Sequence, residues 1–299
     1  MEWQDGGESR DIEDRRGSSG GGEFGGGGGG ISPFLLFGLL RGGPVGIGIF
    51  VLIVLFGLFR SGHFFSGNQS NQSAITRQAA PATQSASEQR DVKLISYVLD
   101  DAQNTWAQIF AANHRQYRHA TLVLFRDRTR SGCGAAQAAT GPFYCPADQK
   151  IYIDLSFWDE LTHLGGSTSD FAKSYVITHE LGHHIQNLLG IEAREQHLAQ
   201  SSGEENPLSV DLELQADCFA GVWGHDTTDR SKINANDISQ ALKSAAAVGD
   251  DHIQRMSGRA VSPESWTHGS SAGREKWFRT GYDTGKAGAC TTFNGKLAP

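Results

Sequence analysis

The 299-residue sequence has no excess of positive charge. Its 26 Lys and Arg residues are outnumbered by 33 Asp and Glu residues, and the formal net charge is −7. Because nucleic-acid binding needs a basic surface, we expect no nucleic-acid partner. A Gly-rich tract at residues 17–30 is not followed by the GK[ST] element of a phosphate-binding loop, so we interpret the tract as a flexible tether.

Cysteine is also scarce, with four residues and no CxxC pair. Four cysteines allow three disulfide connectivities, and four reduced buried thiols are the alternative. We expect Cys133–Cys145, which would close a loop across a turn-rich segment, and Cys218–Cys290. Disulfides persist in oxidising compartments, so this pairing indicates a domain outside the cytoplasm, either periplasmic or extracellular.

The chain has only one long apolar run. Residues 42–59 carry no charge and lie between Arg41 and Arg60. Eighteen such residues are at the short end of what a membrane-spanning helix needs. The run starts too late for a cleavable signal peptide and no small-x-small site follows it at once, so we predict a single-pass, uncleaved anchor at residues 42–60. The flanking basic residues place the N-terminus in the cytoplasm.

Composition divides the rest of the chain. Residues 1–41, charged and then Gly-rich, are predicted to be disordered, and the polar residues 61–89 to be a linker. Residues 90–299 are enough for one domain with its own core. Apolar periodicity and capping residues predict strands and helices within it, at residues 91–111, 120–126, 149–154, 206–224, 234–255 and 271–282. Strands come first and helices later, which predicts an α+β domain.

The most informative pattern is His-Glu-Leu-Gly-His at residues 179–183. Ser167, Thr168 and Ser169 before it and Gly190 after it predict a helix. On that helix His179 and His183 share one face and can hold one Zn²⁺ ion. Glu180 lies beside the first histidine, where its carboxylate can act as a general base. The alternative is an ordinary core helix whose histidines are hydrogen-bonded or solvated.

Catalytic zinc needs a third protein ligand. The zinc hydrolases that take a histidine six residues after the second one are excluded, because Leu189 stands there. In residues 206–224, which Asn206 could cap, Glu213 and Asp217 are four residues apart on one helix face. We predict that Glu213 is the third ligand and that Asp217 accepts the spare N–H of a zinc histidine. The fallback ligands are Asp211, Glu204, Glu205 and His197.

Three stretches of the chain resemble a known family. HELGHHIQ, ELQADCFAG and WTHGSSAGREKWFRTGYDTG, with the following Cys290, are similar to the bacterial putative neutral zinc metallopeptidase family. The resemblance covers most of residues 90–295. It implies a zincin-like fold, one Zn²⁺ per chain and a peptide or protein substrate. By the same resemblance, the substrate would pair with the strand edge at residues 150–154.

The expected activity is that of a membrane-anchored zinc endopeptidase with Glu180 as general base. A second donor to the oxyanion is usually required, and His268 is the first candidate and Tyr282 the second. Two alternatives are a zinc-stabilised scaffold protein without turnover at the cell envelope and a cell-wall amide hydrolase. The sequence leaves the oligomeric state open.

Overall fold

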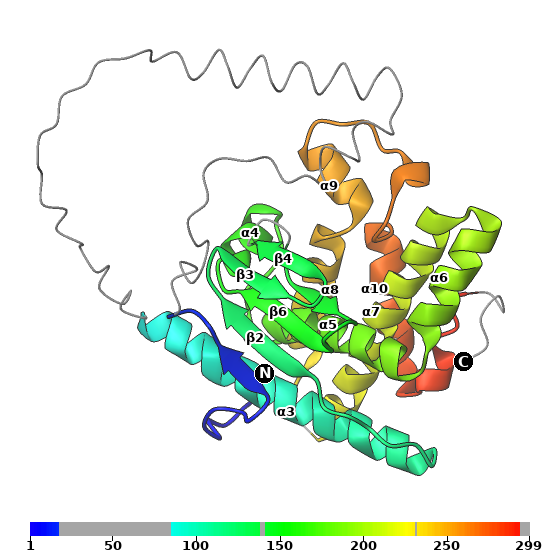
Figure 1. Ribbon diagram of the computed structural model, residues 1–299. Coiled ribbons are helices and arrows are strands. Elements are labelled where there is room, and N and C mark those ends of the chain that lie inside the picture. Colours follow the sequence, from blue (N-terminus) through cyan, green and yellow to red (C-terminus); the bar gives the residue numbers. More distant parts are fainter. Residues whose placement is uncertain (18–84, 138–140, 231, 294–299) are drawn as a thin grey trace, which may run out of the picture. The chain divides into compact units, whose positions relative to one another are not determined.

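Four strands form the main sheet of this protein. The computed structural model describes residues 1–17, 85–137, 141–230 and 232–293 (Figure 1). The strand order is β1 (Ile12–Asp14), β2 (Thr121–Phe125), β6 (Lys150–Asp154) and β5 (Phe143–Cys145). β1, β2 and β6 run parallel to one another, and β5 runs antiparallel to β6. The predicted strands at residues 120–126 and 149–154 are therefore confirmed as β2 and β6.

The predicted position of the free sheet edge is wrong for residues 150–152. β6 lies between β2 and β5, and these three residues are paired on both edges, so they cannot pair with a further strand. The edge strand on this side of the sheet is β5, which has only three residues. Such a short strand between turn residues leaves no periodic pattern in the sequence that would separate it from a loop.

The N-terminal residues are part of the same folded unit as the domain. The prediction of disorder over residues 1–41 is wrong for residues 1–17, where β1 pairs with β2 and Trp3 packs against the core. The indole N–H of Trp3 donates to Asp170 at 2.8 Å, and Lys150 pairs with Glu13 at 2.7 Å. Composition failed to predict this because a few anchoring side chains are enough to order a largely polar segment.

The predicted anchor at residues 42–60 lies outside the described residues, as does most of the predicted linker. Among the helices that the structure does describe, none is long and apolar enough to cross a membrane. The last residues of the predicted linker belong to helix α3 (Ala86–Ala112), which begins earlier than the predicted start at residue 91. Ser85 and Glu88 form its capping box, whereas Asp91 lies inside the helix and pairs with Lys173 at 2.6 Å.

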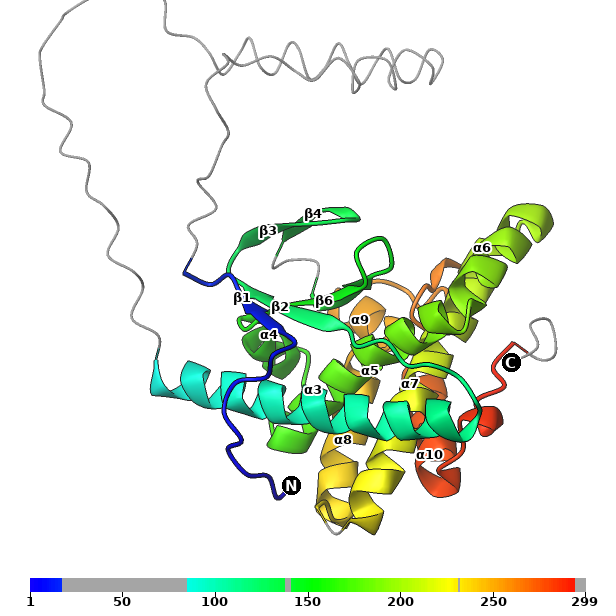
Figure 2. The same cartoon turned by 60° about the horizontal axis from the view of Figure 1, so that its bottom comes forward.

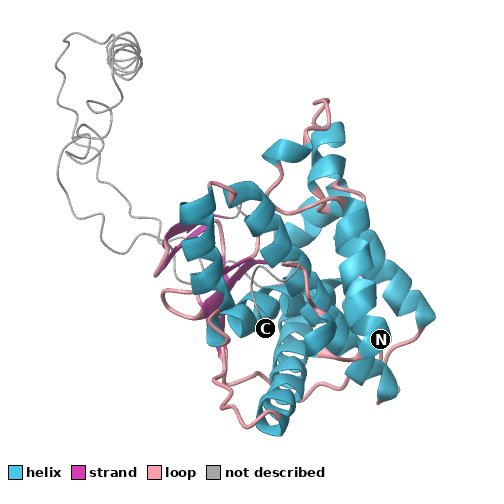
Figure 3. Ribbon diagram, turned by 90° about the vertical axis from the view of Figure 1, so that its right-hand side faces the viewer, coloured by secondary structure: helices cyan, strands magenta, loops and turns pink. Residues whose placement is uncertain are grey.

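Helices cover one face of the sheet and form most of the molecule (Figures 2 and 3). α3 lies under the sheet in Figure 2. The helix predicted after Ser169 is α5 (Asp170–Leu188), and the side chain of Ser169 accepts a hydrogen bond from the N–H of Ala172. The remaining elements are α4 (Phe157–His163), α6 (Ile191–Ser202), α7 (Glu205–Asp229), α8 (Ala235–Ala247), α9 (Asp250–Met256), η2 (Pro263–Ser265), α10 (Ser271–Thr284) and η3 (Ala287–Ala289).

Two helix predictions need correction. Asn206 does not cap α7, because the helix begins at Glu205, and the Asn206 side chain donates to the carbonyl of Glu264 at 2.9 Å. The single helix predicted at residues 234–255 is broken into α8 and α9 at Gly249. A Cβ at Gly249 would lie 2.4 Å from the backbone nitrogen of Ser271, so the chain needs glycine where it passes α10.

Both predicted disulfides are confirmed. Cys133–Cys145 joins β5 to the turn between β3 (Arg128–Ser131) and β4 (Gly134–Gln137), which form a two-stranded sheet. Cys218–Cys290 ties the C-terminal segment to α7. The α+β class is confirmed as well, with the apolar core lying between the sheet and the helices.

Candidate metal centre

Two histidines of α5 lie side by side on the face that looks toward α7. His179 and His183 are one turn apart, as the i, i+4 spacing requires, and their ring centroids are 4.9 Å apart. Both rings line a cavity of about 940 Å³. The helix therefore presents two imidazole ligands to one point in the cavity.

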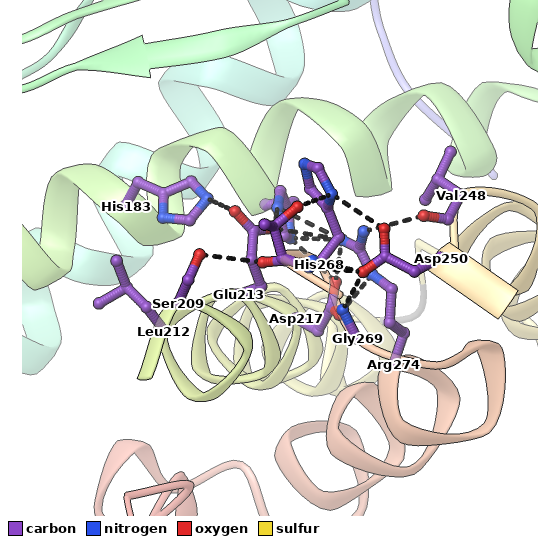
Figure 4. Close-up of polar contacts among 12 residues, drawn as sticks. His183, Ser209, Leu212, Glu213, Asp217, Val248, Asp250, His268, Gly269 and Arg274 are labelled. Atoms are coloured by element: carbon purple, nitrogen blue, oxygen red, sulfur yellow. Dashed lines mark hydrogen bonds and ion pairs between the residues drawn. The ribbon is translucent and has the colours of Figure 1, made fainter. Parts of the chain in front are cut away.

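The third predicted ligand reaches the same point from α7. One carboxylate oxygen of Glu213 is 3.1 Å from Nε2 of His179, and the other is 3.4 Å from Nε2 of His183 (Figure 4). One ligand atom from each of the three residues falls within 4.8 Å of the other two, and within the described ranges no other such group of three is found. The described fallback ligands, Asp211, Glu204, Glu205 and His197, are outside this group.

A glycine inside the motif permits the close approach of α5 and α7. A Cβ at Gly182 would lie 3.0 Å from the Cα of Ala216, closer than an ordinary contact. Ala216 is one residue before Asp217 and three after Glu213. The small residues at this crossing therefore set the distance between the histidines and the two acidic residues.

Asp217 is completely buried and is surrounded by donors. Nδ1 of His179 is 2.9 Å from its Oδ1, and the Tyr175 hydroxyl donates to the same oxygen at 2.5 Å. Because the carboxylate can only accept, Nδ1 carries a proton. In the neutral imidazole Nε2 would then hold the lone pair that a metal needs. Asp217 is thus in position to fix the tautomer of His179, as an acceptor beside a metal-binding histidine does.

Arg274 of α10 is the contact that sequence reasoning missed. Its guanidinium is buried and donates to Asp217 from Nε at 2.8 Å and from Nη2 at 3.1 Å. Nη2 also lies 3.8 Å from the Glu213 carboxylate. Arg274 stands inside the C-terminal stretch that resembles the family, but no spacing rule connects it to an acid 57 residues earlier. Only the packing of α10 on α7 reveals the pair.

The charges of this site are suited to a divalent cation. The site contains three carboxylates, from Glu180, Glu213 and Asp217, and one guanidinium, from Arg274. If both histidines are neutral, the net charge of these groups is therefore −2. In the protein without metal those charges act on the imidazoles. Burial alone would lower the pKa of His179, but Asp217 and Glu213 raise it to about 10. Two imidazoles and one carboxylate are a donor set that fits Zn²⁺.

Glu180 is buried at the cavity wall, and its carboxylate has no hydrogen-bond partner among the described residues. Burial raises the pKa of the Glu180 carboxyl above its ordinary value, although the neighbouring histidines oppose the shift. Because the Glu180 carboxylate accepts no hydrogen bond from the described residues, it is available to exchange a proton with a molecule in the cavity.

Of the two candidates for the oxyanion donor, the structure places one at the cavity. His268 lines it, and Asp250 accepts the backbone N–H groups of Thr267, His268 and Gly269 (Figure 4). Nδ1 of His268 is 3.4 Å from Asp250, which raises the pKa of the imidazole.

Tyr282, the second candidate, is not among the residues that line the cavity. Its hydroxyl accepts from Thr228 and its ring stacks on Phe278.

His184, which follows the second histidine of the motif, points away from the metal position. It is fully buried, and burial lowers the pKa of its imidazole to about 4. Its Nε2 lies 2.6 Å from the carbonyl of Arg118, and its Nδ1 lies 3.1 Å from the hydroxyl of Tyr144. His184 is therefore a neutral residue that links α5 to the sheet rather than a ligand.

The comparisons with known proteins identify a zinc metallopeptidase family. The model of the family described as putative neutral zinc metallopeptidase matches residues 1–293. The uncharacterized protein YpfJ of Escherichia coli K12 is 42% identical over 295 residues, which are 98% of this chain and 99% of that protein. The uncharacterized protein Mb2605 of Mycobacterium bovis is 43% identical over 189 residues, which are 60% of this chain and 64% of that protein. No solved structure matches.

Proposed function

Because the chain belongs to the putative neutral zinc metallopeptidase family, we propose that it is a zinc endopeptidase in which His179, His183 and Glu213 hold the ion. The observation that carries the proposal is the convergence of these three side chains beside the unengaged carboxylate of Glu180. A purely structural zinc site has no need of a free base at that position.

Glu180 acts as the general base and acid. When bound, Zn²⁺ supplies a water of lowered pKa and polarises the substrate carbonyl. Glu180 accepts the proton of the attacking water and returns it to the amine that leaves. Its carboxylate lines the cavity and has no hydrogen bond to the described residues, so it is available for this exchange.

His268 donates a hydrogen bond to the oxyanion of the tetrahedral intermediate. The hydrogen bond with Asp250 favours the protonated imidazole, which keeps a donor available toward the cavity. Asp250 also accepts hydrogen bonds from three backbone N–H groups of the loop that carries His268. These bonds fix the backbone of the loop and so restrict the position of the His268 side chain. Asp217 acts through His179, and Arg274 holds the Asp217 carboxylate in place.

The substrate main chain pairs with β5. Residues 141–144 line the cavity, and within the described part of the chain β5 pairs with a strand on one edge only. An extended peptide added to the other edge would run across the metal centre, as β-augmentation requires. A location outside the cytoplasm and attachment to a membrane through residues 42–60 belong to this proposal as well, with residues 1–17 and the domain on the same side of that membrane.

The decisive experiment compares the full-length protein with its Glu180→Gln variant on a peptide library of mixed sequence. We expect cleavage by the wild type only, with one zinc per chain in both proteins, because Gln keeps the shape of Glu but cannot take the proton. Glu275→Gln, a change on α10 outside the cavity, should leave cleavage unchanged.

Two results would contradict the proposal. Equal cleavage by the wild type and Glu180→Gln would show that Glu180 is not the base. Full zinc occupancy without cleavage of any peptide would favour the scaffold function, unless cell-wall muropeptides are hydrolysed, which would favour the amide hydrolase.

A further inference from the structure

The strand that borders the cavity is held by few backbone contacts. β5 forms only three residue pairs with β6 and none on its other side within the described residues. A three-residue edge strand of this kind opens easily unless side chains fix it. Its position relative to α5 decides where any paired peptide would lie above the metal centre.

Tyr144, in the middle of β5, connects this strand to the helix that carries both metal histidines. Its hydroxyl is 3.1 Å from Nδ1 of His184 and accepts from the side-chain amide of Asn187 at 2.8 Å. His184 and Asn187 lie within one turn after His183. The phenol hydroxyl is therefore hydrogen-bonded to two side chains of α5.

The direction of each hydrogen bond in this contact is determined. Nε2 of His184 faces the carbonyl of Arg118, which can only accept, so Nε2 carries the proton. Nδ1 is then an acceptor, and the Tyr144 hydroxyl must donate to it. The one hydrogen of the Tyr144 hydroxyl is thus donated to Nδ1 of His184, so Tyr144 cannot also donate to an oxyanion in the cavity.

The opposite face of β5 is fixed separately. Phe143 stacks on Tyr152 with ring centroids 5.0 Å apart, and Cys145 is bonded to Cys133. These contacts face the hairpin formed by β3 and β4, whereas Tyr144 packs toward the helices. Among the described residues, Tyr144 is therefore the one that joins β5 to α5 through side-chain hydrogen bonds.

We propose that His184 and Asn187 are positioning residues that hold β5 in a fixed place beside the metal centre through the hydroxyl of Tyr144. This inference rests on the proposed function, because the strand is the one with which the substrate pairs. A peptide long enough to pair with β5 gains from the fixed strand, and a peptide too short to reach it does not. The link acts on substrate binding and leaves the chemical step unchanged.

The test is Tyr144→Phe in the full-length protein, which removes one hydroxyl and keeps the ring. With a long peptide we expect KM to rise about five- to tenfold and kcat to stay within about twofold, which corresponds to a loss of about 1 to about 1.4 kcal/mol of binding free energy. With a blocked dipeptide both constants should stay unchanged, and zinc content should equal that of the wild type. Tyr152→Phe is the matched control, because it removes a hydroxyl that bonds to Asp148 on the other face of the sheet.

A wild-type KM in Tyr144→Phe would overturn the inference. An equal loss of kcat with both peptides would also overturn it, because it would place the phenol in the chemical step. Hydrogen–deuterium exchange of residues 141–146 provides a test that needs no activity. Exchange there should be faster in Tyr144→Phe and Asn187→Ala than in the wild type and Tyr152→Phe, and equal rates would refute the link even if the wild type cleaves no peptide.

Discussion

At the scale of single residues, the contact that most constrains the site is Arg274 with Asp217. Both are buried, and removing one partner of a buried ion pair leaves an uncompensated charge. We predict that Arg274→Met lowers the free energy of unfolding by about 3–5 kcal/mol, measured by urea denaturation. Arg279→Met, an exposed change on the same helix, should stay within about 0.5 kcal/mol. Equal losses in the two variants would show that the pair has no special role.

The hydrogen bond between His268 and Asp250 predicts a pH dependence. Because this bond raises the pKa of His268, the protonated imidazole persists to higher pH than it would alone. In Asp250→Asn the largest contribution to the raised pKa of His268 is lost, so the alkaline limb of kcat/KM should move to lower pH. Asn keeps an oxygen that can accept from the backbone of residues 267–269.

The control for this pH profile is Asp251→Asn, because Asp251 bonds to Ser271 and Arg255 and not to His268. Its alkaline limb should coincide with that of the wild type. An alkaline limb that stays in place in Asp250→Asn would exclude His268 as the donor that titrates.

At the scale of elements, α10 crosses α7 at a glycine, Gly281, which packs directly against the backbone of α7. A Cβ at Gly281 would lie 1.9 Å from the carbonyl oxygen of Cys218, so α10 would have to move away from α7. We predict that Gly281→Ala lowers the melting temperature and weakens zinc binding, because α10 carries Arg274 and α7 carries Glu213. Gly288→Ala, where nothing lies within 4 Å of the added atom, is the control. Identical melting curves for the two variants would contradict the prediction.

Local patterns predicted the elements that carry the ligands, and long-range packing decided the rest. The helix with His179 and His183 was predictable because its spacing, cap and stop are local signals. Glu213 followed from the i, i+4 rule together with the need for a third ligand. Arg274 was not predictable, because its partner depends on how α10 crosses α7. The order of the strands was not predictable either, because β1 and β5 have three residues each and no periodicity.

At the scale of the whole molecule, the N-terminal segment restricts how the chain can be arranged at a membrane. Residues 12–14 pair with β2, and Trp3 and Glu13 bond to side chains of the domain. A single crossing between residues 17 and 85 would separate these partners by a bilayer. We therefore expect both parts to lie on the same side, and the disulfides indicate that this side is outside the cytoplasm.

Cysteine labelling tests this arrangement in cells that express the full chain. Glu8→Cys and Lys276→Cys place one new thiol in each part, at positions that are exposed. A maleimide that does not cross membranes should label both in spheroplasts without permeabilisation. If both thiols needed permeabilisation, the two parts would still share one side, but that side would be the cytoplasm. If only Lys276→Cys were labelled, β1 could not pair with β2 in the cell, because residues 1–17 would lie across the membrane from the sheet.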